Sequence, residues 1–190
     1  LEPCSHHGKT PPCCDLVLAK GIKKVIIGAK DPNPKVAGRG VAALKAAGVE
    51  VISGVLEADC LELNKRFYCF HTRKRPYIIL KWAQTGDGYI APKDYKIGKV
   101  FWISDDDSQQ LAHRWRAEEH AILVGRKTVV NDNPKLTTRK WKGTNPIRLV
   151  IDPSNSIDEN AHILNGDAKT VVFNNSLTKK EANVNWVSIT

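Results

Sequence analysis

An α/β protein is the fold class that this sequence of 190 residues predicts. Two compact apolar runs, at residues 24–29 and 49–55, have the length and composition of buried strands. Between them, residues 40–47 have the pattern of a helix that ends at Gly48. Strands that alternate with helices over such short spacings form a sheet with helical crossovers, which is the α/β arrangement.

The remaining elements of the first part of the chain are predicted in the same way. Residues 13–20 should form a short helix, which Gly21 closes as a C-terminal cap. Residues 57–70 should form one longer amphipathic helix. The residues of that helix expected to face the core are Leu61, Leu63 and Phe67. Pro76 disfavours helix in the residue before it, so residues 73–76 mark a break.

A second unit is expected after this break. Residues 77–85 are a strand candidate, followed by a turn at residues 86–88. Ser104 should cap a helix over residues 105–118, with Asp107 completing a capping box. The inward stripe of that helix is expected to be Leu111, Ala112 and Trp115. Further strands are predicted at residues 121–125, 147–152, 170–173 and 186–189.

Composition narrows the class of protein. A hydrophobic fraction of 42% is adequate for a packed core. No run approaches the ~20 apolar residues of a membrane span, and no signal-peptide pattern opens the chain. We therefore expect a cytoplasmic protein with no membrane partner. The 5 cysteines cluster unevenly in a chain that is not a short secreted scaffold, which favours reduced thiols over a disulfide framework.

The chain carries a formal net charge of +9, which can steer anionic ligands or nucleic acid. Its densest basic cluster is Lys65, Arg66, Arg73, Lys74 and Arg75. Two interpretations of this cluster stay open, a solvated helix end and a nucleic-acid surface with neighbouring aromatic residues. Because the cluster is confined to one predicted helix end, we expect no nucleic-acid partner. A phosphorylated small substrate would also account for scattered cationic residues.

Two thiols near the start of the chain suggest metal chemistry. Cys4 and Cys13 each follow a proline, and zinc takes sulfur ligands at ~2.3 Å in a tetrahedral site. Zinc-dependent base deaminases place such a Pro-Cys segment downstream of a His-x-Glu segment. No His-x-Glu occurs in this chain, and the chain contains no Met, so we expect a fragment that begins inside a catalytic motif. A purely structural zinc site is the alternative.

Two stretches of sequence carry a resemblance to a known family. They are residues 1–13, which read Leu-Glu-Pro-Cys-Ser-His-His-Gly-Lys-Thr-Pro-Pro-Cys, and residues 31–40, which read Asp-Pro-Asn-Pro-Lys-Val-Ala-Gly-Arg-Gly. Together they resemble the bifunctional riboflavin-biosynthesis deaminase-reductase family. The match continues through residues 77–139 and 146–152 and thins toward Thr190. A member of this family should begin before Leu1 and extend beyond Thr190.

The resemblance implies a fold and a division into domains. Residues 1–74 would be the C-terminal part of a cytidine-deaminase-like α/β/α domain that binds Zn²⁺. Residues 75–190 would be the first part of a dihydrofolate-reductase-like α/β domain that uses NADPH. The implied partner is a phosphorylated ribosylaminopyrimidine, which is first deaminated by hydrolysis and then reduced from ribosyl to ribityl. We expect a homo-oligomer, and we expect the fragment alone to be inactive.

The resemblance also assigns roles in the deaminase site. Cys4 and Cys13 would be two of the three protein ligands of the zinc ion, whereas the histidine ligand and the proton-carrying glutamate would lie upstream. The residues implied to contact the pyrimidine substrate are His6, Lys9, Asp31 and Asn33. A second role for His6, as a partner of a metal ligand or as a solvent-exposed ring, stays open.

For the reductase site the resemblance implies an active-site lysine, Lys81. The residues implied to contact the cofactor are Ala83, Trp102, Thr128, Asp132 and Pro153. Those implied to contact the substrate are Val100, Arg116, Leu136 and Arg139. Val100 stands where the family has a small polar residue and Pro153 where it often has serine, so side-chain hydrogen bonds are not expected there. Simple core packing of Trp102 and an exposed helix charge at Arg116 are the alternatives.

Overall fold

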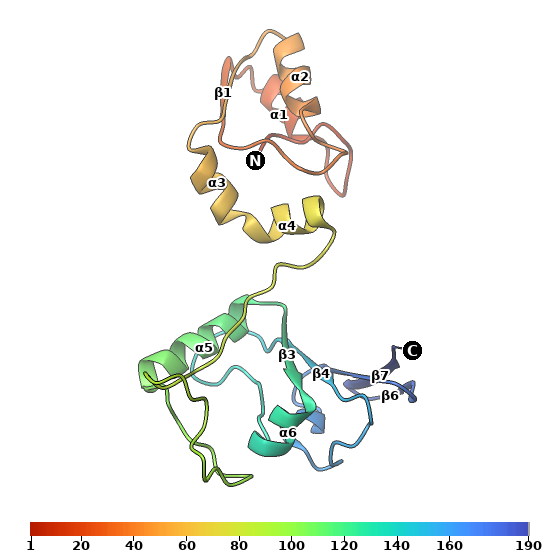
Figure 1. Cartoon of the computed structure of the whole chain (residues 1–190). Coiled ribbons are helices and arrows are strands. Elements are labelled where there is room, and N and C mark those ends of the chain that lie inside the picture. The colour runs from red at the N-terminus through yellow and green to blue at the C-terminus, as the bar shows by residue number, and fades with distance from the viewer. Residues whose placement is uncertain (190) are drawn as a thin grey trace. The chain divides into compact units, whose positions relative to one another are not determined.

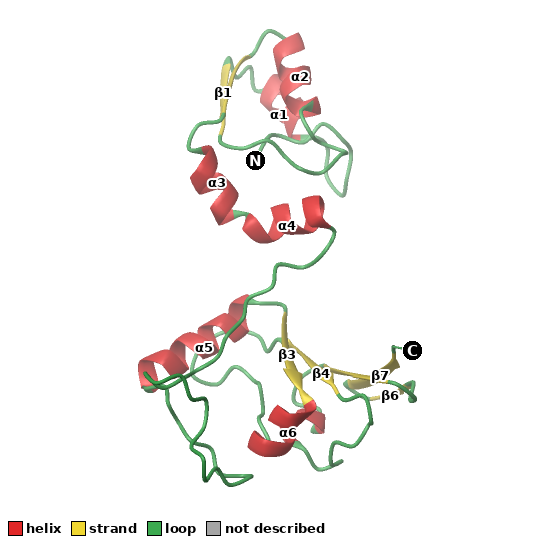
Figure 2. Cartoon of the chain, in the orientation of Figure 1, coloured by secondary structure: helices red, strands yellow, loops and turns green. Residues whose placement is uncertain are grey.

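The computed structural model describes residues 1–189, and the chain forms two compact units, Leu1–Leu80 and Lys81–Thr190. Helices alternate with strands in each unit (Figures 1 and 2), which confirms the predicted α/β class. None of the helices in the described residues is long and apolar enough to cross a membrane.

The first unit is built on two parallel strands. Its elements are α1 (Cys13–Ala19), β1 (Lys24–Ile27), α2 (Arg39–Ala46), β2 (Glu50–Ser53), α3 (Glu57–Leu63) and α4 (Lys65–Arg73). In the register of the two strands Lys24 lies opposite Glu50. Cys14 of α1, Leu44 of α2 and Val49 form the buried core, against which apolar residues of both strands pack. The four elements predicted between residues 13 and 55 are confirmed to within a few residues.

The second unit contains a mixed five-stranded sheet with strand order β3-β4-β5-β7-β6. Its elements are α5 (Asp106–Glu118), β3 (Ala121–Gly125), α6 (Arg126–Asp132), β4 (Ile147–Ile151), the 3-10 helix η1 (His162–Leu164), β5 (Thr170–Asn174), β6 (Lys179–Glu181) and β7 (Val184–Ser188). β3, β4, β5 and β7 run parallel, whereas β6 is antiparallel to β7. The core beneath the sheet includes Val129, Val150, Ile163 and Val172.

Several local predictions were wrong. Residues 77–85 are not a strand: they have no regular secondary structure, and the Leu80 side chain is 77% exposed. An apolar run favours a strand only where a partner strand completes its hydrogen bonds, and none of the described strands pairs with this one. Residues 57–70 form two helices rather than one, because the chain turns at Asn64 between α3 and α4. Leu63, expected in the core, is 82% exposed.

The start and the buried face of α5 also differ from the prediction. The side chain of Asp105, not that of Ser104, caps the helix by accepting a hydrogen bond from the Ser108 N–H at 2.9 Å. The residue that α5 buries is His113, whereas Leu111 and Trp115 are exposed. The face of α5 predicted from its hydrophobic residues is therefore not the face that packs inward. The helix α6 and the short edge strand β6 were not predicted.

A fully buried arginine joins the loops of the second unit. Arg148 lies on the inner face of β4, opposite Thr170 of β5. Its Nε donates to the Thr170 hydroxyl at 2.9 Å, and Nη2 donates to the Ala168 carbonyl at 2.9 Å. Nη1 donates to the carbonyls of Lys135 and His162, at 3.1 and 3.2 Å. A buried charge is tolerated when its donors are satisfied, and here backbone carbonyls satisfy them.

We expect Arg148→Met to lower the free energy of unfolding by about 3 kcal/mol, because it leaves buried carbonyl groups without donors. Urea unfolding followed by circular dichroism measures this change. The matched control is Arg114→Met, since Arg114 is exposed, pairs with Glu118 on the same helix and lies 5.7 Å from the centre of the Trp141 ring. That control should cost no more than about 0.5 kcal/mol. Equal losses of unfolding free energy in the two variants would contradict the role of Arg148 as a buried residue that holds the loops.

Candidate functional site

The structure brings the two predicted zinc ligands together. The Cys13 N–H, at the first residue of α1, donates to the Cys4 sulfur at 3.3 Å. The pKa of Cys13 is raised, first because of a side-chain hydrogen bond to Cys4 and then because of the charge of Cys4. Two neighbouring thiols suit zinc as two of its four donors. Among residues 1–189 no third His, Cys, Asp or Glu joins them in a group that could hold a metal ion.

A buried carboxylate, that of Glu2, holds the Asp31–Gly38 loop beside the thiol segment. Glu2 is only 5% exposed. Both of its carboxylate oxygens accept from the Gly38 N–H at 2.9 Å, and Oε2 also accepts from the Asp31 N–H at 3.2 Å. Within the loop, the Asp31 carboxylate accepts from the Asn33 N–H at 2.7 Å. The loop with two predicted substrate residues is therefore tied to the segment that bears Cys4.

Two further details describe the surroundings of the thiols. A Cβ atom placed on Gly40 would lie 1.9 Å from the Pro3 carbonyl oxygen, so only glycine allows the N-terminal segment to approach α2 this closely.

The Nδ1 atom of His6 is buried and has no hydrogen-bond partner among the described residues. A buried polar atom of this kind is usually paired, so the histidine is suited to contact a bound molecule. Lys9 is exposed in the same loop.

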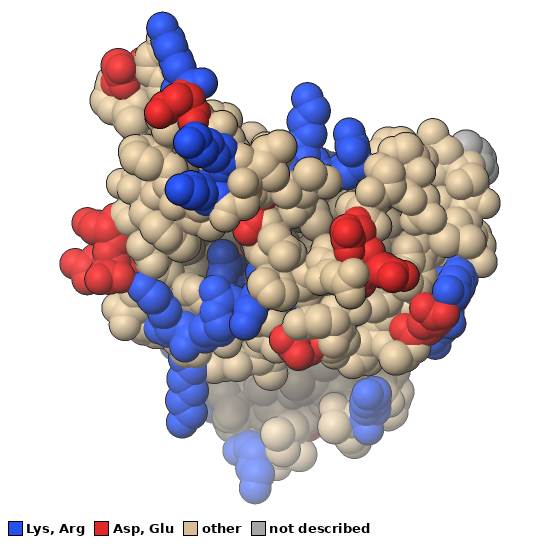
Figure 3. Space-filling view, turned by 90° about the horizontal axis from the view of Figure 1, so that it is seen from below, with Lys and Arg blue, Asp and Glu red and all other residues tan. Residues whose placement is uncertain are grey.

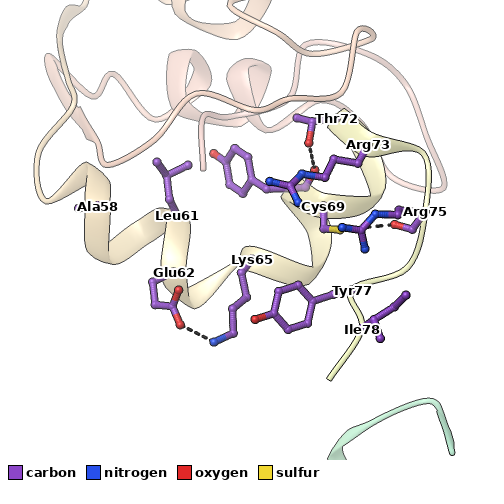
Figure 4. A pocket seen from close by; sticks show the side chains of 11 residues that line it. Ala58, Leu61, Glu62, Lys65, Cys69, Thr72, Arg73, Arg75, Tyr77 and Ile78 are labelled. Atoms are coloured by element: carbon purple, nitrogen blue, oxygen red, sulfur yellow. Dashed lines mark hydrogen bonds and ion pairs between the residues drawn. The ribbon is translucent and has the colours of Figure 1, made fainter. Parts of the chain in front are cut away.

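Three residues of the basic cluster, Lys65, Arg73 and Arg75, line a groove of about 740 Å³ between α3, α4 and the residues that follow α4 (Figure 4). Its cations are engaged locally: Lys65 pairs with Glu62 and lies 5.5 Å from the centre of the Tyr77 ring. The Arg75 side chain donates to the Pro76 carbonyl at 3.1 Å. Elsewhere, basic side chains are interspersed with acidic ones on the face shown in Figure 3. These contacts favour the solvated helix end over a nucleic-acid surface.

Three of the predicted cofactor residues of the second unit, Thr128, Asp132 and Pro153, lie in segments that follow its parallel strands. The helix α6, which carries Thr128 and Asp132, follows β3 directly, and Pro153 comes two residues after β4. Parallel strands end at the same edge of a sheet, and open α/β sheets bind ligands outside that edge. Thr128 and Asp132 are four residues apart on α6, so their side chains lie on one face of the helix. Thr128, Asp132 and Pro153 are all exposed.

Asp132 also connects α6 to the segment before α5. Its carboxylate accepts from the Tyr95 hydroxyl at 2.8 Å, and this hydrogen bond is the first cause of the raised pKa of Tyr95. The Gly98 N–H donates to the Asn131 carbonyl at 2.9 Å. The segment with Val100 and Trp102, both exposed, is thereby held next to α6. Tyr95, which sequence reasoning missed, is the residue that makes this connection.

Lys81 and Ala83 lie in a stretch without regular secondary structure. Lys81 is exposed and Ala83 is half-buried. No contact in the described residues brings either of them to the other predicted reductase residues. The exposure of Trp102 contradicts the core-packing alternative for that side chain.

Two guanidinium groups, those of Arg116 and Arg139, meet over Thr137. Nη1 of Arg116 donates to the Thr137 carbonyl at 3.2 Å. Nη1 of Arg139 donates to the same carbonyl at 3.3 Å and to the Thr137 hydroxyl at 2.9 Å. The pKa of Arg116 is lowered by burial and then by the charge of Arg139, with no carboxylate acting on it. Arg116 is therefore half-buried beside a second cation, not an isolated exposed helix charge.

Leu136 belongs to this loop, but its side chain is buried in the hydrophobic core. Its φ of 54° places it in the left-handed region, which is costly for a leucine. The anchoring of Lys135 by Arg148 and the burial of the Leu136 side chain hold this conformation. A ligand would accordingly meet the backbone of Leu136 rather than its side chain.

His113 completes the cluster and was missed by sequence reasoning. It is 5% exposed, and its Nδ1 accepts from the Arg139 N–H at 2.8 Å. Burial lowers the pKa of His113 to about 4, with further lowering by Arg116, Arg139 and Lys140. Its three-residue spacing from Arg116, which places both on one helix face, was the signal in the sequence.

The sequence model described as the RibD C-terminal domain matches residues 76–187, and the chain belongs to this family. The expected resemblance is thereby confirmed. The riboflavin biosynthesis protein RibD of Aquifex aeolicus is 44% identical over 183 residues, which cover 95% of this chain and 49% of that protein. RibD of Escherichia coli is 39% identical over 171 residues, covering 83% of this chain and 46% of that protein.

Solved structures agree with the sequence relatives. A diaminohydroxyphosphoribosylaminopyrimidine deaminase/5-amino-6-(5-phosphoribosylamino)uracil reductase from Thermotoga maritima is similar with a TM-score of 0.88 and 40% identity. The match covers 100% of this chain and 53% of that one. Acinetobacter baumannii RibD is similar with a TM-score of 0.85 and 32% identity, covering 100% of this chain and 54% of that one. The chain thus spans about half the length of the relatives that it matches.

The low pKa of His113 predicts a pH dependence of stability. The ordinary pKa is 6.5 and the folded value about 4, so between these pH values the unfolded chain binds a proton that the folded chain does not. The free energy of unfolding should fall as pH falls through this window, by roughly 3 kcal/mol in total. Urea unfolding at several pH values should show that His113→Leu removes this part of the slope. The same pH dependence in both proteins would contradict the prediction.

Proposed function

We propose that this chain acts in riboflavin biosynthesis and that its second unit reduces the ribosyl side chain of a phosphorylated aminopyrimidine with NADPH. The observation that carries this proposal is the pair Arg116 and Arg139, which meet with no carboxylate between them. Guanidinium groups suit phosphate because each can donate two parallel hydrogen bonds. The relatives named as reductases support the reaction class.

In this proposal the residues of the second unit have three roles: binding the cofactor, binding the substrate and holding a proton. NADPH, when bound, would supply the hydride. Thr128, Asp132 and Pro153 would hold it at the carboxyl edge of the sheet, with Ala83 and Trp102 contributing from the preceding segment. Arg116 and Arg139 would hold the substrate phosphate, and the backbone at Leu136 and the side chain of Val100 would border the sugar. Lys81 would hold a proton on Nζ near the reacting sugar.

The first unit is proposed to carry part of a zinc deaminase site. The thiolates of Cys4 and Cys13 would hold the ion, which when bound would supply an activated water. His6, Lys9, Asp31 and Asn33 would orient the pyrimidine. The tie between Glu2 and the Asp31–Gly38 loop supports this grouping, because it brings the thiol segment and the substrate loop together. The proposed domain boundary remains residue 74.

We expect phosphate recognition to depend on both arginines. Ribose 5-phosphate is the probe, titrated into the full chain while backbone amide NMR signals are followed. Arg116→Gln and Arg139→Gln should each weaken binding about tenfold, since each removes charge-assisted hydrogen bonds. Arg114→Gln, an exposed position on the same helix, is the control and should bind like the unaltered chain. Absence of binding, or equal weakening in the control, would sink the proposed phosphate site.

The chain by itself should not release ammonia from the diaminopyrimidine substrate. No His-x-Glu segment occurs in its 190 residues, so the glutamate that carries protons in zinc deaminases is lacking. An ammonia assay with added zinc tests this expectation. Sustained zinc-dependent turnover that Cys4→Ser abolishes would show that another residue of this chain carries the proton.

A further inference from the structure

His113 has two ring nitrogens, and each faces a hydrogen-bond donor. Nδ1 lies 2.8 Å from the backbone nitrogen of Arg139, and Nε2 lies 3.3 Å from Nη1 of Arg116. A neutral imidazole carries one hydrogen, so only one of its nitrogens can accept a hydrogen bond. One of the two contacts therefore cannot be a hydrogen bond.

The shorter contact determines where the hydrogen resides. The Arg139 N–H donates to Nδ1 at 2.8 Å, which is a good hydrogen-bond distance, whereas the 3.3 Å contact of Nε2 is longer. Nδ1 must then be unprotonated, and the hydrogen of the neutral ring is on Nε2. The Nε2–H of His113 and the N–H groups of Arg116 Nη1 are then both donors, and they face each other without an acceptor between them.

The charged side chains that act on the ring are all cations, and one of them, Lys140, is itself paired with the Asp106 carboxylate at 2.7 Å. Arg116 faces it from α5, and Arg139 and Lys140 face it from the loop that follows Leu136. No carboxylate is among the groups that shift the pKa of His113. The two guanidinium groups therefore have more donors than acceptors: both donate to the Thr137 carbonyl, and Arg139 also donates to the Thr137 hydroxyl. An anion would supply the missing acceptors.

We propose that His113 is the positioning residue of this anion site. Its Nδ1 fixes the backbone of Arg139, and its Nε2–H prevents the ring from accepting from Arg116. The Arg116 guanidinium is thereby left with donor capacity for a phosphate oxygen. The inference rests on the proposed phosphate site. It adds the requirement that the His113 ring is neutral and carries its hydrogen on Nε2. His113 acts through the two arginines.

Two substitutions separate the two ring nitrogens. His113→Asn keeps an oxygen acceptor near the place of Nδ1, whereas His113→Gln moves the acceptor toward the place of Nε2. Inorganic sulfate is the probe, because its charge is constant over the pH range of the experiment. In the full chain, His113→Asn should bind sulfate within about threefold of the unaltered protein, and His113→Gln about tenfold more weakly. Equal affinities of the two variants would overturn the inference.

A second measurement needs no variant. Nitrogen-15 NMR of the His113 ring at neutral pH should show the hydrogen on Nε2, before and after sulfate is added. A hydrogen on Nδ1 would overturn the inference even if one of the variants fails to fold.

The two proposals fail in different ways. If Arg116→Gln and Arg139→Gln abolish sulfate binding while His113→Asn and His113→Gln are alike, the phosphate site stands and the role of His113 is wrong. If the unaltered chain binds neither sulfate nor ribose 5-phosphate, both proposals are wrong. Arg114→Gln serves again as the control for a change of charge on α5.

Discussion

The buried guanidinium of Arg148 is the interaction on which the second unit depends. A charge within a core must have its donors satisfied, and Arg148 satisfies them with carbonyls of Lys135, which follows α6, and of His162 and Ala168, between β4 and β5. One of these carbonyls belongs to Lys135, directly before the left-handed Leu136 and the loop that carries Arg139. Arg148 on β4 thus holds the loop, and the loop places Arg139 and the Thr137 carbonyl next to Arg116 of α5.

The first unit uses the same principle with the opposite charge. Glu2 is a buried carboxylate that accepts from backbone N–H groups of the Asp31–Gly38 loop. In each unit, a buried charged side chain forms hydrogen bonds with the backbone of a loop that carries predicted ligand-contacting residues. This arrangement explains how short loops can hold polar side chains in place without a disulfide or a long helix.

Much of the candidate site was predicted from sequence motifs, whereas its supporting residues were not. The thiols Cys4 and Cys13, nine positions apart, lie next to each other, as two ligands of one ion would have to. Arg116 and Arg139 share an acceptor although 23 positions separate them, which only the resemblance indicated. His113 was not predicted, because its three-residue spacing from Arg116 indicates a shared helix face but does not show whether that face is buried.

The sequence by itself determined the alternation of helices and strands, because apolar periodicity and glycine caps act over a few neighbouring residues. It also determined the family, through two short motifs. Only the tertiary structure decided that residues 77–85 lack strand pairing, that α5 buries His113, and that Arg148 is a core residue. Each of these depends on partners distant in the chain, and the free energy of burying a polar group is set by whether those partners satisfy it.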